Sequence, residues 1–305
     1  MATAAEPKAA ELPLRGGRDG HPSDGATVRL HPLLTATIQG PPAWFLREEG
    51  RFAWRKAFGL GVPKDQWFTA PIQAFLLEHP SAGNVLVDTG FHGSVAVSPR
   101  SNLGALGTVI YQDIEMDPEQ AVAAQLRQKG IEPSSVKTVI MTHLHPDHAS
   151  AIADFPGATF LVSTAEWEAA THSGQRDGYV KRQFDHGFDY RLVDFDSDDA
   201  NSFSGFARSF DVFGDGSVRI AFTPGHTAGH MSVIVQTAHG EMLLAGDAIF
   251  MRRTLDEEHL PHMAFDEHLF RRSLREIKQY VKETPDAVVV PGHDWATWQK
   301  LELVY

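Results

Sequence analysis

The sequence of 305 residues contains no cysteine, and this absence excludes disulfide bonds as a support for the fold. It also excludes zinc sites built on thiolates, so any metal ion must be bound by nitrogen and oxygen atoms. Such a ligand set suits Zn, with Mn, Fe and Co as alternatives. Because a chain without cysteine is compatible with either redox compartment, the absence does not predict where the protein resides.

Long apolar runs are missing as well. No stretch approaches the roughly 18 apolar residues that a membrane-spanning helix requires. Residues 1–27 mix alanine, proline, glycine and charged residues without the apolar core, about 7–15 residues long, of a secretory signal. We therefore predict a disordered leader at residues 1–27, no membrane partner and a cytoplasmic location.

Positive charge is scarce, with 27 Lys and Arg against 39 Asp and Glu and a formal net charge of -12. A surface that follows nucleic-acid phosphates needs a basic stripe, so nucleic acid is not a predicted partner. The hydrophobic content of 42% is enough to bury a substantial core. The composition therefore predicts a soluble globular protein.

What the chain does contain is a dense group of potential metal ligands. Residues 142–148 read THLHPDH and follow a β-branched run. His143 and His145 can reach one ion from a turn after a strand, and Asp147 and His148 can face a second ion. A solvated polar loop is the alternative interpretation, but four ligand-type residues within six positions favour a metal site.

Three later segments repeat the pattern of a strand-like run, a glycine and a ligand-type residue. These residues are His226, Asp247 and His293. Each alone is typical of a hydrogen-bonded loop histidine or a turn aspartate. Together with the first group they bring five histidines and two aspartates to one predicted sheet edge, which is an inventory for two ions. An inactive metal-stabilised binding protein is disfavoured, because a structural zinc site is normally closed by four ligands.

The remaining pattern predicts an α/β protein. Helices are predicted at residues 117–130 after Asp117, 164–171 capped by Thr164, and 266–281 capped by Asp266. Strands are predicted at residues 28–39 (interrupted by Pro32), 72–77, 84–88, 136–141, 159–162, 218–223, 231–236, 242–245 and 287–290. Residues 172–210 receive no assignment, and the acidic run at 194–199 is interpreted as a solvated face rather than a calcium loop.

Residues 41–69 form an aromatic segment that is too apolar for a disordered linker. Two interpretations stay open: a flap packed on the core or on a second subunit, which would allow a homodimer, and a lid over an apolar substrate tail. The second interpretation predicts a substrate pocket formed by Trp44, Phe45, Trp67, Phe68 and Phe250. Asp88, at the end of a predicted strand, is either an Asx turn or a residue that orients a metal ligand.

The chain resembles the metallo-β-lactamase superfamily over residues 28–305 in the order and spacing of its motifs. These are His143-x-His145-x-Asp147-His148, Thr223-Pro-Gly-His226-Thr-x-Gly, Gly246-Asp247 and Gly292-His293, with Asp88-Thr89-Gly90 as a further match. The resemblance implies one α/β domain, a four-layer αββα sandwich with an aromatic insertion at about 41–69.

The same resemblance implies the roles of the ligands. His143, His145 and His226 would bind one divalent ion, most simply Zn. Asp147, His148 and His293 would bind the other, and Asp247 would bridge the two. Asp88 and Thr142 would orient the ligands through hydrogen bonds.

Gly292-His293-Asp294 and the helix before it resemble the N-acyl-homoserine-lactone lactonases within the superfamily. This implies hydrolysis of a lactone by a metal-bridging hydroxide, with N-acyl-homoserine lactones as the candidate substrate (quorum quenching). Asp147 and Asp247 would be the catalytic carboxylates, and Asp147 would pass a proton to the leaving alkoxide.

One position departs from the lactonase pattern. Lactonases usually carry a tyrosine three residues after the bridging aspartate, whereas this chain has Phe250. Tyr111, Tyr179 and Tyr190 remain open as the source of a phenol. The alternative activity is that of a glyoxalase-II-like thioesterase or another carboxylic ester hydrolase. A thioesterase shares the motif around His226, but the chain offers only Lys300 as a basic residue after His293.

Overall fold

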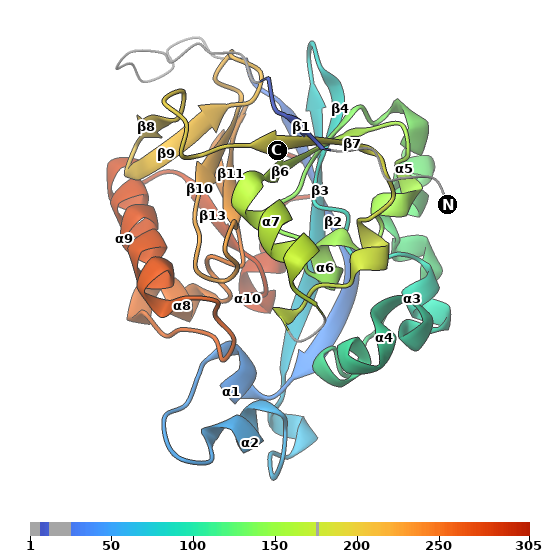
Figure 1. Cartoon of the computed structure of the whole chain (residues 1–305), viewed down its shortest axis with the longest axis vertical. Coiled ribbons are helices and arrows are strands. Elements are labelled where there is room, and N and C mark those ends of the chain that lie inside the picture. Colours follow the sequence, from blue (N-terminus) through green and yellow to red (C-terminus); the bar gives the residue numbers. More distant parts are fainter. Residues whose placement is uncertain (1–6, 12–25, 175–176) are drawn as a thin grey trace.

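The computed structural model describes residues 7–11, 26–174 and 177–305. Two β-sheets pack face to face, and helices cover the outer face of each sheet (Figure 1). The four layers confirm the predicted αββα sandwich. Among the described residues, no helix has both the length and the apolar character needed to cross a membrane.

The first sheet has seven strands within the described residues, in the order β1-β7-β6-β5-β4-β3-β2. The pairs β2–β3 and β3–β4 are antiparallel, and all other pairs in this sheet are parallel. The bounds are β1 (Lys8–Ala9), β2 (Arg29–Gly40), β3 (Phe68–His79), β4 (Gly83–Val87), β5 (Thr138–Ile140), β6 (Thr159–Ser163) and β7 (Asp189–Val193).

The second sheet has six strands within the described residues, in the order β13-β12-β11-β10-β9-β8. All pairs are antiparallel except β12 with β13. The bounds are β8 (Asn201–Phe203), β9 (Phe206–Asp211), β10 (Val218–Phe222), β11 (Met231–Thr237), β12 (Gly240–Gly246) and β13 (Val288–Pro291). The stretch that received no assignment therefore supplies β7, β8 and most of β9.

The helices flank the sheets and the connections between them. The α-helices are α1 (Pro42–Phe45), α2 (Ala53–Ala57), α3 (Ser94–Val97), α4 (Pro99–Ile110), α5 (Val122–Gln128), α6 (Pro146–Ala149), α7 (Thr164–His172), α8 (Arg252–Glu257), α9 (Glu267–Glu283) and α10 (Trp295–Trp298). The 3-10 helices are η1 (Lys64–Gln66), η2 (Pro118–Gln120), η3 (Pro133–Ser135), η4 (Ile152–Asp154) and η6 (Lys181–Gln183).

Three apolar cores hold the layers together. Between the two sheets, side chains such as Val85 and Leu77 meet Val233 and Leu244. A second core joins the first sheet to α5 and α7, and a third joins the second sheet to α9. Each fully buried aliphatic or aromatic side chain contributes about 1.5–3 kcal/mol. The sandwich thereby fixes the strand ends from which the site is built.

Several local predictions were wrong in detail. Pro32 does not interrupt β2, because β2 is the last strand of its sheet and a missing N–H is tolerated at an edge. The predicted helix at 117–130 divides into η2 and α5, since Ala121 adopts an extended conformation. The N-cap of α7 is Ser163, whose side chain accepts a hydrogen bond from Glu166 N.

The N-terminal prediction also needs a correction. Lys8 and Ala9, which fall within the predicted disordered leader, pair in parallel with β7. Residues 1–6 and 12–25 of that leader lie outside the described part of the chain.

The aromatic segment connects two paired strands. β2 and β3 are paired from Arg29 and Glu78 to Gly40 and Phe68, with one register shift between Leu34 and Ala36, so residues 41–67 form an excursion from a long hairpin. This excursion carries α1 and α2 and extends beyond the end of the sheets, at the bottom of Figure 1.

Candidate active site

The predicted metal ligands follow the ends of strands from both sheets. His143 comes shortly after β5, and Asp147 and His148 lie in α6 directly behind it. His226, Asp247 and His293 follow β10, β12 and β13. The structure gathers all seven into two groups whose potential ligand atoms lie within 4.8 Å of one another: His143, His145 and His226 in group one, and Asp147, His148, Asp247 and His293 in group two.

Asp247 stands between the groups, and Nε2 of His293 lies 3.3 Å from both of its oxygens. Its Oδ2 atom lies 3.2 Å from Nε2 of His226 and 3.9 Å from Nε2 of His143. Its Oδ1 atom lies 3.3 Å from Nε2 of His148 and 3.3 Å from Nε2 of His293. A single carboxylate therefore faces both sets of imidazoles.

Several buried atoms at this point have no hydrogen bond. They include Nε2 of His143, Nε2 of His148 and Oδ1 of Asp247. Leaving such a polar group unpaired costs about 1–3 kcal/mol, and more when the group is charged. A divalent cation in each group would take up these lone pairs, and imidazole with carboxylate is a donor set that Zn, Mn, Fe and Co accept. The residues therefore fit a dinuclear metal site.

The two groups have opposite electrostatic character. Burial lowers the pKa of His143 and that of His226 well below the ordinary value, so both rings are neutral at pH 7. Burial also acts to lower the pKa of His148, but the carboxylates of Asp147, Asp88 and Asp247 raise it well above the ordinary value.

The neighbouring histidines lower the pKa values of both aspartates. Burial acts to raise the pKa of Asp147, yet His148 and His293 bring it down to about 2. Burial opposes ionisation of Asp247 as well, and His293, His226 and His148 hold its pKa well below the ordinary value. Both aspartates are therefore negatively charged at pH 7.

Asp88 and Thr142, the two residues predicted to orient ligands, lie directly beside group two. Nδ1 of His148 donates to Oδ2 of Asp88 at 2.7 Å. Thr142 donates to both oxygens of Asp88, from its amide and from its hydroxyl, each at 2.7 Å. The hydrogen bond at Nδ1 leaves Nε2 of His148 pointing toward the carboxylates.

The sequence reasoning missed two further buried supports. Nε2 of His230 accepts a hydrogen bond from Asp247 N at 2.9 Å, and burial lowers the pKa of His230 to about 3, which keeps this ring a neutral acceptor. Its place at the end of the motif that begins with Thr223 was the available signal. Glu166 is the second support, and a glutamate in the first turn of a short helix gave no signal for it.

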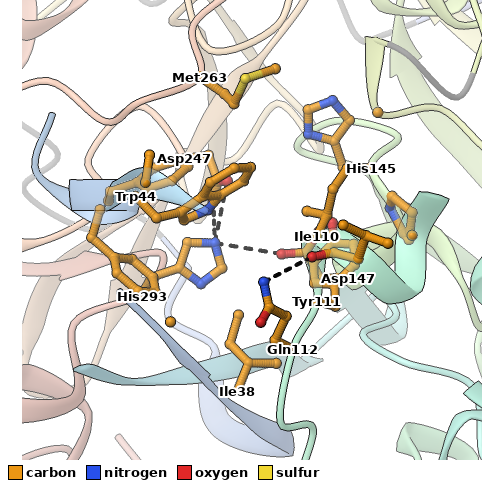
Figure 2. Close-up of a pocket in the computed structure, with 18 of the residues that line it drawn as sticks. Ile38, Trp44, Ile110, Tyr111, Gln112, His145, Asp147, Asp247, Met263 and His293 are labelled. Carbon is orange, nitrogen blue, oxygen red and sulfur yellow. Dashed lines mark hydrogen bonds and ion pairs between the residues drawn. The ribbon is translucent and has the colours of Figure 1, made fainter. Parts of the chain in front are cut away.

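A cavity of about 1020 Å³, open mouth included, lies above the two groups. Its floor holds His145, Asp147, Asp247 and His293, and Figure 2 shows these side chains converging. Apolar side chains make most of the wall: Ile38, Trp44, Phe45, Phe58, Val109, Ile110, Val180, Phe250 and Met263. The arrangement offers a polar reaction centre beneath an apolar binding surface.

Three of the five predicted pocket residues line this cavity, namely Trp44, Phe45 and Phe250. The Phe250 ring lies 5.1 Å from that of His226 and 5.0 Å from that of His293.

The other two predicted pocket residues lie outside the cavity lining. Nε1 of Trp67 donates to the carbonyl of Val62, so this ring packs within the excursion. Phe68 lies behind Phe45, with ring centroids 6.2 Å apart. Their prediction as pocket residues was wrong, because aromatic composition does not give the direction of a side chain.

Of the three phenols left open, Tyr111 lies at the site. Its hydroxyl donates to Oδ1 of Asp147 at 2.6 Å, and its side chain lines the cavity (Figure 2). Burial and the charge of Asp147 raise the pKa of Tyr111 well above the ordinary value, so the phenol keeps its proton. Tyr179 donates to Glu166, and Tyr190 donates to the carbonyl of Phe184.

Sequence comparisons agree with this geometry. The family model described as the metallo-beta-lactamase superfamily matches residues 69–293. The N-acyl homoserine lactonase AttM of Agrobacterium fabrum is 33% identical over 245 residues, which cover 78% of this chain and 88% of that protein. The N-acyl homoserine lactonase AiiA of Bacillus thuringiensis subsp. kurstaki is 30% identical over 228 residues, covering 73% and 81%.

Solved structures share the fold. A quorum-quenching N-acyl homoserine lactone lactonase superposes with a TM-score of 0.70 at 23% identity, covering 91% of this chain and 97% of that one. An N-acyl homoserine lactone hydrolase with the product N-hexanoyl-L-homoserine bound at its catalytic metal centre has a TM-score of 0.71 at 23% identity, with the same coverage. The dizinc quorum-quenching lactonase AidC has a TM-score of 0.58 at 14% identity, covering 89% of each chain.

Proposed function

The chain belongs to the metallo-β-lactamase superfamily, and on that premise we propose that it is a dinuclear metal-dependent hydrolase that opens lactones, with N-acyl-homoserine lactones as the substrate class. The observation that carries this proposal is the position of Asp247 between two ligand groups at the floor of an apolar-walled cavity. Curated relatives of about one-third identity are named for that activity.

In this proposal His143, His145 and His226 hold one ion, and Asp147, His148 and His293 hold the other. Asp247 would be shared between the two ions, since it lies near imidazoles of both groups. Two divalent cations, of which Zn is the simplest choice, would supply hydroxide from water at neutral pH and polarise the ester carbonyl.

Two side chains of the protein would act on the substrate oxygens, one by hydrogen bonding and one by proton transfer. Tyr111 presents a protonated phenol in the cavity wall, and its one O–H, which donates to Asp147 in this structure, could turn to the carbonyl oxygen as negative charge develops there. This assigns to Tyr111 the phenol that Phe250 cannot provide. Asp147 is charged, so it would first take the proton of the attacking water oxygen and then pass that proton to the ring oxygen that leaves.

The rest of the cavity suits an apolar tail attached to a polar ring. Trp44 and Phe58 come from the excursion, and Val109 and Ile110 come from the end of α4. Burial of an acyl chain against these side chains would contribute about 0.8 kcal/mol per methylene group. Longer acyl chains are therefore expected to bind more tightly until the wall is filled.

A substrate panel tests the proposal. The metal-loaded protein would be assayed with N-acyl-homoserine lactones, unsubstituted γ-lactones, aryl esters and thioesters, by proton release or thiol release. We expect kcat/KM to be highest for the acylated lactones. Strong thioester turnover without lactone turnover would instead identify a thioesterase, and a folded protein that binds no divalent ion would contradict the whole assignment.

A further inference from the structure

Glu166 is a buried carboxylate that the proposed reaction does not use. It lies in the first turn of α7 and is 1% exposed. Among the described residues no lysine or arginine forms an ion pair with it, and it does not line the cavity. A polar group buried in such a place needs hydrogen-bond donors to replace the water that it has lost. The identity of its donors indicates its role.

Three donors converge on this carboxylate. Oε1 accepts from Leu144 N at 2.9 Å and from the hydroxyl of Tyr179 at 3.1 Å. Oε2 accepts from Gly229 N at 3.2 Å. Leu144 stands between two ligands of group one, and Gly229 belongs to the turn that begins at His226. One carboxylate therefore connects the two loops that carry all three ligands of this group.

The turn at Gly229 is closely docked on α7. A Cβ atom at Gly229 would lie 2.0 Å from Glu166 N and 2.2 Å from Oγ of Ser163, so only glycine fits. Oγ of Ser163 donates to the carbonyl of Gly229 at 2.6 Å and accepts from Glu166 N at 3.0 Å. The hydroxyl and the carboxylate together fix this turn from both sides.

The third donor leads to His145. The ring of Tyr179 lies 5.2 Å from the ring of His145, whose Nε2 donates to the carbonyl of Asp177 at 3.1 Å. Nδ1 of His145 is thereby directed to Nε2 of His226, at 2.9 Å. His145 is the one half-buried ligand of the seven, and this network supports it on its outer side.

We propose that Glu166 is a positioning residue for group one, which sets the distance between the loop of His143 and His145 and the turn of His226. The inference rests on the proposed assignment of these three histidines to one ion. A carboxylate is suited to the task because it is an acceptor only, so all three donors can bind it at once. Group two makes no contact with Glu166 and should not depend on it.

The decisive variant is Glu166→Gln, which keeps the shape but places an amide N–H₂ against a backbone N–H. We expect affinity for one of the two ions to fall by about 10–100-fold, the usual effect of losing an outer hydrogen bond to a metal ligand. Metal content at matched free Zn²⁺ should fall from two ions per chain toward one. Glu168→Gln, on the exposed side of the same helix, is the matched control and should retain both ions.

Spectra of the Co²⁺-loaded protein identify which ion is lost. The d–d spectrum of Glu166→Gln at limiting Co²⁺ should match that of His226→Ala, which lacks a ligand of group one, and differ from that of His293→Ala. Two ions bound with unchanged affinity would overturn the inference. A lower melting temperature of the ion-free protein with unchanged affinity would do the same, because it would indicate a purely structural role.

A second variant guards against failure of the first to fold. Tyr179→Phe removes one of the three donors and should lower the affinity for the same ion by a smaller factor. No change in that affinity would contradict the inference. These measurements do not require a substrate. A wild-type chain that binds two ions but opens no lactone would thus contradict the proposed function while leaving the role of Glu166 separately tested.

Discussion

The two ligand groups differ in charge and in what holds them. Group one consists of three imidazoles, two of which burial keeps neutral, and Glu166 supports its loops through backbone amides. Group two contains two carboxylates, and its histidine His148 is fixed by the side chain of Asp88. The geometry of group one therefore depends on how loops dock on α7, whereas that of group two depends on a network of charged side chains.

The difference has a consequence for the ion-free protein. In group two, His148 and His293 can take up protons beside Asp147 and Asp247, and the four side chains then compensate one another. Group one has no carboxylate of its own and shares only Asp247. Protons can therefore compensate for the missing ion in group two, while in group one Nε2 of His143 is left without a hydrogen-bond partner.

The largest effect is expected from Asp247→Asn, which removes the one residue common to both groups. A neutral amide cannot offer a charged oxygen to each side, so kcat/KM should fall on the order of 10³-fold, and metal content should fall below two ions per chain. Steady-state kinetics with metal analysis measure both. Asp256→Asn, on the exposed face of α8, is the control, and wild-type activity in Asp247→Asn would remove the shared role.

Tyr111→Phe tests whether the phenol next to group two donates a hydrogen bond to the carbonyl oxygen of the substrate. Loss of the donor should lower kcat by about 10²-fold. Both ions should be retained, because the hydroxyl of Tyr111 donates to Oδ1 of Asp147 and Oδ2 stays available for the metal. Restoring a phenol from the opposite wall, in Tyr111→Phe with Phe250→Tyr, should recover part of kcat. If Tyr111→Phe loses an ion and the double variant recovers nothing, the phenol orients Asp147 and does not act on substrate.

Asp88→Asn acts directly on group two through His148, and reaches group one only through Thr142, whose hydroxyl also lies 3.1 Å from Nδ1 of His143. The amide can no longer accept from His148 and from both donors of Thr142, so affinity for one ion should fall by about 10–100-fold. The Co²⁺ spectrum at limiting metal should match that of His293→Ala, in contrast to Glu166→Gln. Identical spectra for Asp88→Asn and Glu166→Gln would show that the two groups are not supported independently.

The smallest expected effect is a loss of stability when the ions are removed. An ion present at 100 times its Kd stabilises the folded chain by about 2.7 kcal/mol. For a chain of 305 residues, loss of one such ion corresponds to a melting temperature lower by roughly 4 °C. Differential scanning fluorimetry with increasing chelator would record it, and two successive decreases would separate the groups. An unchanged melting temperature would argue against both ions.

Sequence reasoning found the residues that come together in the two groups because their signals are local. A ligand that follows a glycine at the end of a strand can be identified from a few neighbouring residues, and His226 and Asp247 both satisfy that rule. The αββα architecture follows in the same way from the alternation of strand-like and helix-like runs. These features need no knowledge of which segments meet in space.

The parts that were missed, wrongly predicted or left open depend on non-local contacts. Tyr111 reaches the site from the end of α4, a helix that was not predicted because Gly104, at φ 77°, interrupts its helical pattern. Glu166 acts on residues 22 and 63 positions away. Trp67 and Phe68 resemble Trp44 in composition, and only the fold determines that their rings turn away from the cavity.

The hairpin of β2 and β3 carries part of the cavity wall on a segment that contains none of the predicted metal ligands. Its strands are paired up to Gly40 and Phe68, so the excursion between them can change in length or sequence without moving a ligand. Each doubling of a loop costs only about 0.6 kcal/mol in closure entropy. Grafting a different excursion onto Gly40 and Phe68 would thus exchange the Trp44 and Phe58 wall as a module, and would redirect the enzyme to another tail while its reaction centre stays intact.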